Sequence, residues 1–248
     1  MRTREFPDPS EGVFLNTAAW GLIPLSAAKE AADLTLRRNR PRGFSESEFR
    51  IVQHRCRNAL ARLLRVDAHE IALGPNTSYG VSLAAAAVAS GPPGTIVVSP
   101  GEFPANVLPW KALERRGFVV QLVPTDDSGC PREDLIRAAL DGPDVRALAL
   151  SAVQFATGYR ADLRGLGVAC KERDILFCVD AIQALGAVEL FPREAHVDVL
   201  AAGGQKWLCS AWGTGFTYIA RELLDRSDPP RASWLGVTGG GRLSDMLR

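Results

Sequence analysis

The sequence predicts an α/β fold in which helices cover a mostly parallel β-sheet. From Thr95 onward, short runs of β-branched and apolar residues alternate with stretches of helical spacing. Parallel strands need crossover connections, usually helices, so this alternation favours a parallel sheet over hairpins. The chain has 248 residues, 46% of them hydrophobic, which is enough for one substantial core.

The first third of the chain predicts an entry segment followed by helices and one short strand. Residues 1–25 contain Gly21 and Pro24 and are expected to form an N-terminal segment. Helices are expected over 26–38 and 46–64, a strand over 71–73, and an alanine-rich helix from the turn at 74–78 to Ala89.

The rest of the chain predicts strands separated by helices, which together form one large domain over 26–235. Strands are expected over 96–99, 119–123, 147–151, 176–180, 197–201 and 216–219, with helices over 106–115, 132–140 and 163–173.

Composition excludes several classes of function. The net charge is +1, from 29 basic and 28 acidic residues, so no global field favours nucleic acid or an anionic membrane. No apolar run reaches the roughly 18 residues that span a bilayer. Five cysteines without a C-x-x-C pair, and three histidines without ligand spacing, predict a reduced, cytoplasmic protein with no metal site.

A lysine and an aspartate carry the strongest functional signal. Asp180 closes the apolar run 175–179, and Lys206 follows 26 residues later, which leaves room for one crossover and one more strand. A lysine amine with an ordinary pKa of about 10.4 is protonated and unreactive, so a catalytic lysine needs a site that favours its neutral form. A buried aspartate can hold a proton on a pyridine nitrogen. The pair suggests pyridoxal phosphate chemistry, against the alternative of a surface lysine and an unrelated aspartate.

Other polar and aromatic residues are expected at the same edge of the sheet, where α/β proteins bind ligands. Thr77 and Ser78 stand where a helix would begin, so they could cradle a phosphate or simply cap the helix. Phe103 follows a strand and could stack on a flat ring, or belong to the core. Gln183 lies three residues after Asp180 and could share its edge.

Five sequence pieces, in this order, resemble the class V aminotransferase family of fold type I pyridoxal phosphate enzymes, which includes cysteine desulfurases and kynureninase. They are Phe14-Leu15-Asn16-Thr17-Ala18-Ala19, Asn76-Thr77-Ser78-Tyr79-Gly80, Glu102-Phe103-Pro104-Ala105-Asn106, Val179-Asp180-Ala181-Ile182-Gln183 and Gln205-Lys206-Trp207. The resemblance covers nearly the whole chain and implies the three-layer α/β/α large domain of that family.

The resemblance also implies a role for each matching residue. Lys206 would form a Schiff base with pyridoxal 5'-phosphate and shuttle the α-proton of the substrate. Asp180 would pair with the pyridine nitrogen, Gln183 would hydrogen-bond the phenolic oxygen, and Phe103 would stack on the ring. Thr77 and Ser78 would hold the phosphate, and Gln154 falls near a polar position beside the phenolic oxygen.

The sequence departs from the family pattern in three places. Gly203-Gly204-Gln205 stands where many members have Ser-x-His, so one hydroxyl donor to the phosphate is lost, although Gln205 could still donate. Phe103 replaces the stacking histidine of cysteine desulfurases and cannot transfer protons, which disfavours that activity. Family members also continue into a small C-terminal domain, of which residues 236–248 would be only the start.

These observations predict an enzyme that acts on an amino acid or amine, most generically a transaminase, through Lys206. Family members are homodimers with sites at the subunit interface, so a homodimer is expected. A kynureninase-like lyase, a cysteine desulfurase, and a non-catalytic remnant or accessory subunit are the alternatives.

Overall fold

A computed structural model describes residues 5–6 and 12–227 of the chain. The predicted boundary between residues 235 and 236 lies outside the described residues. The predicted boundary at residue 25 falls where the first helix begins. The division into domains therefore stays a prediction.

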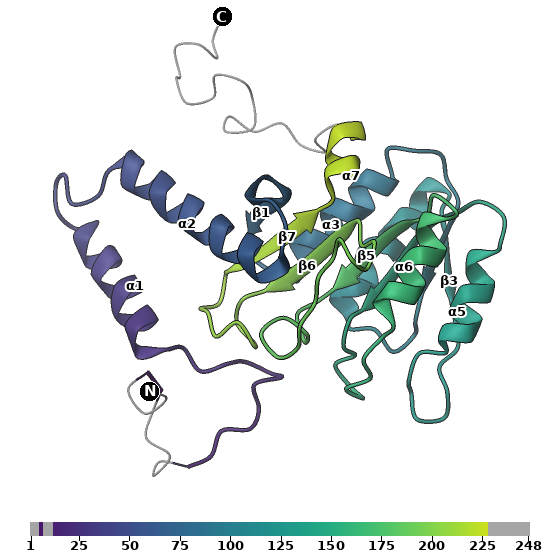
Figure 1. Cartoon of the computed structure of the whole chain (residues 1–248), viewed down its shortest axis with the longest axis horizontal. Helices are drawn as coiled ribbons and strands as arrows, with labels where there is room; N and C mark the ends of the chain where they lie inside the picture. The colour runs from purple at the N-terminus through teal and green to yellow at the C-terminus, as the bar shows by residue number, and fades with distance from the viewer. Residues whose placement is uncertain (1–4, 7–11, 228–248) are drawn as a thin grey trace, which may run out of the picture.

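The centre of the molecule is a seven-stranded, mostly parallel sheet, as predicted (Figure 1). The strands stand in the order β1-β7-β6-β5-β4-β2-β3. Neighbours from β6 to β3 pair in parallel, whereas β7 is antiparallel to both β1 and β6. Their bounds are β1 Ile71–Gly74, β2 Thr95–Val98, β3 Val119–Leu122, β4 Val145–Ser151, β5 Leu176–Asp180, β6 Val199–Gly203 and β7 Gly215–Ile219.

Helices lie on both faces of this sheet and complete a three-layer arrangement. Helix α3 (Thr77–Val88) packs on β5, β6 and β7, and α5 (Glu133–Leu140) and α6 (Leu163–Lys171) cover the other face (Figure 1). The remaining helices are α1 Leu25–Arg37, α2 Glu46–Leu64, α4 Leu108–Lys111 and α7 Arg221–Arg226, with 3₁₀ turns η3 Ala68–Glu70, η4 Pro104–Asn106 and η5 Ala112–Arg116.

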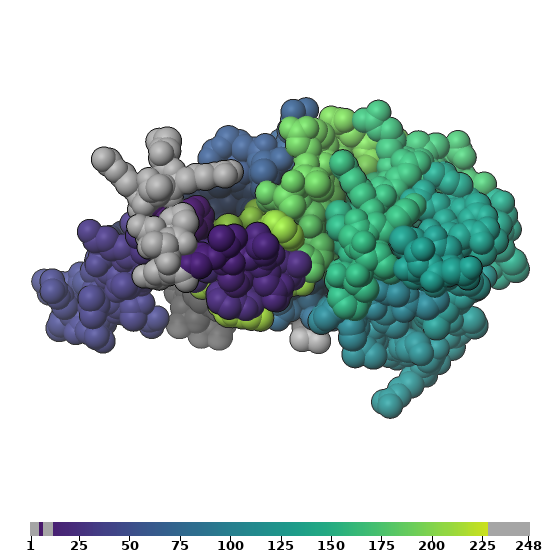
Figure 2. Space-filling model, turned by 90° about the horizontal axis from the view of Figure 1, so that it is seen from below, coloured from purple at the N-terminus to yellow at the C-terminus, as the bar shows by residue number. Residues whose placement is uncertain are grey.

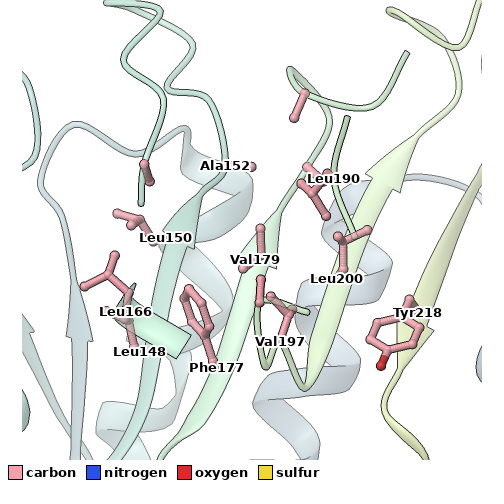
Figure 3. Close-up of a cluster of buried hydrophobic side chains, with 14 of the residues drawn as sticks. Leu148, Leu150, Ala152, Leu166, Phe177, Val179, Leu190, Val197, Leu200 and Tyr218 are labelled. Atoms are coloured by element: carbon pink, nitrogen blue, oxygen red, sulfur yellow. The ribbon is translucent and has the colours of Figure 1, made fainter. Parts of the chain in front are cut away.

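Successive side chains of each strand point to opposite faces of the sheet, so the hydrophobic core is divided into two layers. In β5, Phe177 and Val179 pack in the cluster that contains Leu166 of α6 (Figure 3). Cys178, between them, packs with the residues of α3 on the opposite face. All five residues of β5 are buried, which explains why this strand reads as a continuous apolar run rather than as an alternating one.

The predicted elements are present, with shifts where prolines and loops intervene. The helix expected over 106–115 is broken into η4, α4 and η5, since Pro104 and Pro109 remove backbone donors and restrict the preceding residues. Strand β6 begins two residues later than expected, and the crossover from β5 to β6 contains no helix. Helix α2 has the predicted bounds because a capping box of Ser45 and Glu48 closes its first turn.

The buried carboxylate of Glu70, just before the edge strand β1, joins three segments of the chain. Glu70 is 3% exposed and accepts hydrogen bonds from the amide nitrogens of Asp67 (2.9 Å) and Arg221 (3.2 Å). It also accepts from the Arg193 guanidinium at 2.6 Å. These contacts join η3 to the loop before β6 and to the start of α7.

We expect Glu70→Ala to lower the free energy of unfolding by about 2 kcal/mol, because two part-buried amide donors and the Arg193 guanidinium lose their acceptor. Urea denaturation of the purified chain measures this loss. The matched control is Glu172→Ala, which removes an exposed carboxylate beside Arg173 and should cost no more than about 0.5 kcal/mol. Equal losses in the two variants would contradict this account.

Candidate active site

A cavity of about 460 Å³ lies where the carboxyl ends of the parallel strands meet the N-terminus of α3. This is the edge at which parallel α/β sheets bind ligands. Seven of the predicted site residues line it, namely Thr77, Ser78, Phe103, Asp180, Gln183, Gln205 and Lys206. The fold thus brings together residues that are up to 129 positions apart in the sequence.

Asp180 is the buried acid of this cavity. It ends β5, is 2% exposed, and accepts a hydrogen bond from the amide of Ile182 at 2.9 Å. Burial raises the pKa of Asp180 to about 7, while the Ile182 amide opposes the rise. An anion in this position is poorly solvated, so the site favours either a proton on Asp180 or a cation against it.

Lys206 follows β6 and lies in the same cavity. Burial lowers the pKa of the Lys206 ammonium, and the nearby Asp180 carboxylate opposes that shift. Its Nζ atom lies 5.7 Å from the centre of the Phe103 ring. A lysine whose neutral form is favoured is suited to attack a carbonyl group.

Phe103 is held at the mouth of the cavity by a buried carboxylate next to it in sequence. Glu102 accepts hydrogen bonds from the Ser151 amide (2.9 Å) and the Asn106 side chain (2.8 Å), as well as from the Ser151 hydroxyl. The Phe103 ring is 45% exposed and meets the Phe155 ring edge-on, with centroids 5.3 Å apart. Phe103 therefore faces the cavity rather than the core.

The N-terminus of α3 presents backbone donors to the cavity. Asn76 is the N-cap, and its side chain accepts from the Tyr79 amide at 2.9 Å, so Thr77 and Ser78 are not the capping residues. The Thr77 hydroxyl accepts from the Gly203 amide at 2.9 Å and joins α3 to β6. First-turn amides without intrahelical partners, together with these hydroxyls, can bind an anion.

Gly203 leaves the space that the side chain of Gln205 occupies. A Cβ atom at Gly203 would lie 2.3 Å from Oε1 of Gln205. Gly203 stands where the family pattern has a residue with a hydroxyl group. Its missing side chain leaves room for the side chain of Gln205, which lines the cavity.

The N-terminal segment lies across the loop that carries Lys206. The Gly21 amide donates to the Gln205 carbonyl at 2.7 Å, and a Cβ atom at Gly21 would lie 2.1 Å from the Lys206 carbonyl oxygen. The Gln183 side chain donates to the Ala18 carbonyl at 2.9 Å. Figure 2 shows the dark purple N-terminal segment against later, green to yellow parts of the chain.

Gln154 is the predicted site residue that the structure does not bring into the cavity. It is 2% exposed, and its Nε2 donates to the carbonyls of Gly101 and Gly129, each at 3.1 Å. Its Oε1 accepts from the Thr157 hydroxyl. Its neighbour Phe155 lines the cavity instead, since adjacent residues of a loop point in different directions.

Sequence reasoning assigned no role to several residues that line the cavity, namely Asn16, Ala18, Ala19, Phe155, Ile182 and Trp212. Residues 14–19 form one of the five sequence pieces that resemble the family, and this resemblance could have indicated that Asn16, Ala18 and Ala19 lie at the site. Trp212 lies in a loop and is 73% exposed, and nothing in its sequence context marks it.

A larger cavity, of about 600 Å³, lies at the opposite edge of the sheet. Its charged side chains are already matched, as in the pairs of Arg193 with Glu70 and of Arg226 with Asp174. It also contains a lysine, Lys171, and a buried acid, Glu70, but the Glu70 carboxylate is already bonded to Arg193 and to two backbone amides. We therefore take the cavity of Lys206 as the candidate active site because of the residues that line it, although it is the smaller of the two.

Some kinds of site are absent from the part of the chain that the structure describes. Residues 5–6 and 12–227 contain no group of three or more His, Cys, Asp or Glu side chains that could hold a metal ion. None of the helices within those ranges combines the length and the apolar character needed to cross a membrane.

The fold and this cavity define the large domain of a pyridoxal phosphate enzyme of fold type I. The family model described as Aminotransferase class-V matches residues 37–238. The chain belongs to that family, and its cofactor is pyridoxal 5'-phosphate.

Two curated relatives are 29% and 30% identical to this chain over the aligned residues. A probable cysteine desulfurase of Pyrococcus abyssi is 29% identical over 98% of this chain and 60% of its own length. An isopenicillin N epimerase of Streptomyces clavuligerus is 30% identical over 94% of this chain and 59% of its own length. The chain is thus shorter than these relatives and spans about 60% of their length.

Solved structures show the same fold. A cysteine desulfurase from Thermococcus onnurineus superposes with a TM-score of 0.80 at 24% identity, over 92% of this chain and 58% of that one. A cysteine desulfurase from Escherichia coli gives 0.76 at 26% identity, over 90% and 58% of the respective chains.

We expect Asp180→Asn to stabilise the cofactor-free protein at alkaline pH. The folded-state pKa of Asp180, about 7, lies above the ordinary 3.8, so the folded state binds this proton more tightly than the unfolded state. The contribution of Asp180 to stability therefore falls as pH rises from about 4 to about 7. Asparagine removes the charge, and at pH 8 we expect a gain on the order of 2 kcal/mol in urea denaturation.

The gain should shrink steadily as the pH is lowered toward 4. The control, Asp127→Asn, removes an exposed carboxylate and should leave stability within about 0.5 kcal/mol at either pH. A gain in Asp180→Asn that is independent of pH would contradict the assigned burial cost.

Proposed function

We propose that the chain binds pyridoxal phosphate in the cavity of Lys206 and acts on an amino acid or amine, with transamination as the reaction. The observation that carries this proposal is the pairing of Lys206 with the buried Asp180 in one cavity. A complete pair of this kind supports an enzyme over a non-catalytic remnant or accessory subunit.

The residues present fit the cofactor. Asp180 is a buried carboxylate, and among the described residues only the half-buried Lys206 opposes its charge; a protonated pyridine nitrogen would supply a cation in contact with it. Thr77, Ser78 and Gln205 line the cavity and would hold the phosphate, and Phe103 would stack on the ring. Gln183 would donate to the phenolic oxygen, since only one of its two amide hydrogens is bonded to Ala18. Gln154, whose amide is already bonded to the protein, would support the loop rather than touch the cofactor.

The bound cofactor supplies an electron sink that makes the hydrogen on the α-carbon of the substrate acidic. Lys206 Nζ would take this proton and, for transamination, pass it to the cofactor rather than back to the α-carbon. Burial lowers the pKa of the Lys206 ammonium group and so favours the neutral, basic form that this step needs. Asp180 would remain charged beside the pyridine nitrogen. The aromatic rings of Phe103, Phe155 and Trp212 would exclude water from the reacting side of the cavity.

Epimerisation is a second candidate, because the Streptomyces clavuligerus relative named isopenicillin N epimerase aligns over 94% of this chain. Epimerisation begins, like transamination, with removal of the proton from the α-carbon, but a proton then returns to that carbon on the opposite face. A kynureninase of Deinococcus radiodurans, 27% identical over 94% of this chain, keeps a lyase reaction among the alternatives.

Cysteine desulfuration is less well supported, although several relatives are named for it. Phe103 cannot transfer a proton, and none of the described residues that line the cavity is a cysteine. Cys209, the cysteine nearest to Lys206 in sequence, contacts the Trp207 carbonyl at 3.7 Å instead.

We expect Lys206→Ala to abolish the visible absorption that pyridoxal phosphate acquires on binding, because no other amine lines the cavity within the described residues. Titration of the purified chain with the cofactor, followed by spectroscopy, measures this. Lys111→Ala, at an exposed lysine of α4, should keep the band. A protein that gains no band at all would sink the proposed function.

We also propose that the chain forms a homodimer through its N-terminal helices and that it works in the cytoplasm. Helix α1 has no buried residue, and Leu36 on α1 and Ile51 on α2 are 60% and 56% exposed. Both helices project beyond the layers around the sheet (Figure 1). Apolar side chains on such a projection are suited to pack against a second copy of the chain.

The proposed cytoplasmic location is supported by the cysteines. All five cysteines are free thiols, as suits a reducing compartment.

Light scattering after size exclusion should give twice the mass of the chain. The double variant Leu36→Asp/Ile51→Asp should shift the mass toward the monomer, because it places charges in the apolar contact. Leu135→Asp, a half-exposed site on α5, is the control and should leave the mass unchanged. A monomeric parent chain would refute the dimer.

A further inference from the structure

We propose that Trp207 is a positioning residue that fixes the orientation of the Gln183 amide, so that the second N–H of Gln183 is available as a hydrogen-bond donor to the cavity. This inference rests on the proposed function for the identity of the ligand. It adds a residue that touches neither the cofactor nor the substrate and acts through another side chain.

Two contacts determine the orientation of the amide. The indole Nε1 of Trp207 donates to Oε1 of Gln183 at 2.8 Å, and Nε2 of Gln183 donates to the Ala18 carbonyl at 2.9 Å. An indole N–H can only donate, and a carbonyl oxygen can only accept. Rotating the amide by 180° would set a donor against a donor and an acceptor against an acceptor. Both partners therefore select the same orientation.

The hydrogen-bond count of Gln183 then determines what it offers to a ligand. Its Nε2 carries two hydrogens, and the Ala18 carbonyl takes one of them. Gln183 is 8% exposed and lines the cavity of Lys206. The second hydrogen is free for an acceptor in the cavity, which suits an oxygen that carries negative charge, such as the phenolic oxygen of the cofactor.

The backbone keeps Trp207 within reach of Gln183. Gly186 has φ of +95° and ends the turn that follows Gln183. A Cβ atom at Gly186 would lie 2.3 Å from the Trp207 carbonyl oxygen, so a glycine there allows the loops after β5 and β6 to pass in contact. Since Trp207 directly follows Lys206, the same hydrogen bond joins the loop of the lysine to that of Gln183.

The first test uses Trp207→Phe, which keeps an aromatic ring and removes the N–H. Gln183 loses one of the two partners that select its orientation and keeps only the Ala18 carbonyl, so its donor is held less firmly and stabilises the ionised phenolic oxygen less well. We expect the pH midpoint of the visible absorption of the bound cofactor to rise by roughly one unit. The other ionisable groups that line the cavity, Asp180 and Lys206, are unchanged in this variant.

The matched experiment repeats the substitution in a Gln183→Ala background. If Trp207 acts through Gln183, the shift should fall below roughly 0.2 units there. Trp20→Phe makes the same change at an exposed tryptophan that does not line the cavity, and it should leave the midpoint in place. A Trp207→Phe protein with an unshifted midpoint, or an equal shift in both backgrounds, would overturn the inference.

A second measurement needs neither the cofactor nor a Trp207 variant. In the cofactor-free chain, hydrogen exchange of the Trp207 indole N–H should be at least roughly tenfold faster in Gln183→Ala than in the parent. The indole of Trp110, which is fully buried in α4, should be unaffected. Unchanged exchange at Trp207 would overturn the inference, whereas a visible band that survives Lys206→Ala would overturn only the proposed function.

Discussion

The structure of the site depends on one buried carboxylate at the end of a central strand. Asp180 is flanked by β4 and β6, so it has almost no access to water and only one backbone donor. A charge in such a position is costly until a cation faces it. Lys206, in the loop after β6, offers a half-buried amine, and the proposed pyridine ring would offer a proton to Asp180. Without such a cation the buried charge lowers the stability of the protein, as is common where a site is prepared for a ligand.

The second constraint is that the cavity is assembled from segments that are far apart in the chain. Loops after β2, β5 and β6 and the start of α3 supply its walls, and residues 16–21 close one side of it. Gly21 permits the close approach to the Lys206 loop, and Ala18 contributes only its carbonyl group. The entry segment is thus part of the site, although its side chains there are small or short. This explains why a stretch without regular secondary structure belongs to the matching pieces of the family.

The secondary structure was largely predictable because local signals agreed with the packing. The continuous apolar run of β5, the alanine-rich α3 and the capping box of α2 each indicate one structure. The helix over 106–115 was predicted from its spacing, but the short segments η4, α4 and η5 stand there, and Pro104 and Pro109 lie in the first turns of η4 and α4. Gln154 shows a different limit, because sequence position could not distinguish it from Phe155. One residue of that pair bonds to loop carbonyls and the other faces the cavity, and only the turn of the backbone decides which.

The sequence by itself determined the α/β class, the order of most strands and helices, the family, and thereby the cofactor. These depend on the periodicity of apolar residues and on motifs within short stretches, which are local properties. The tertiary structure decided which residues share a cavity, that Asn76 rather than Thr77 caps α3, and that Gln205 occupies the space beside Gly203. It also brought Ala18, Gln183 and Trp207 into one hydrogen-bonded chain. The directions of side chains and the partners of polar groups depend on crossovers between distant segments, and no local pattern encodes them.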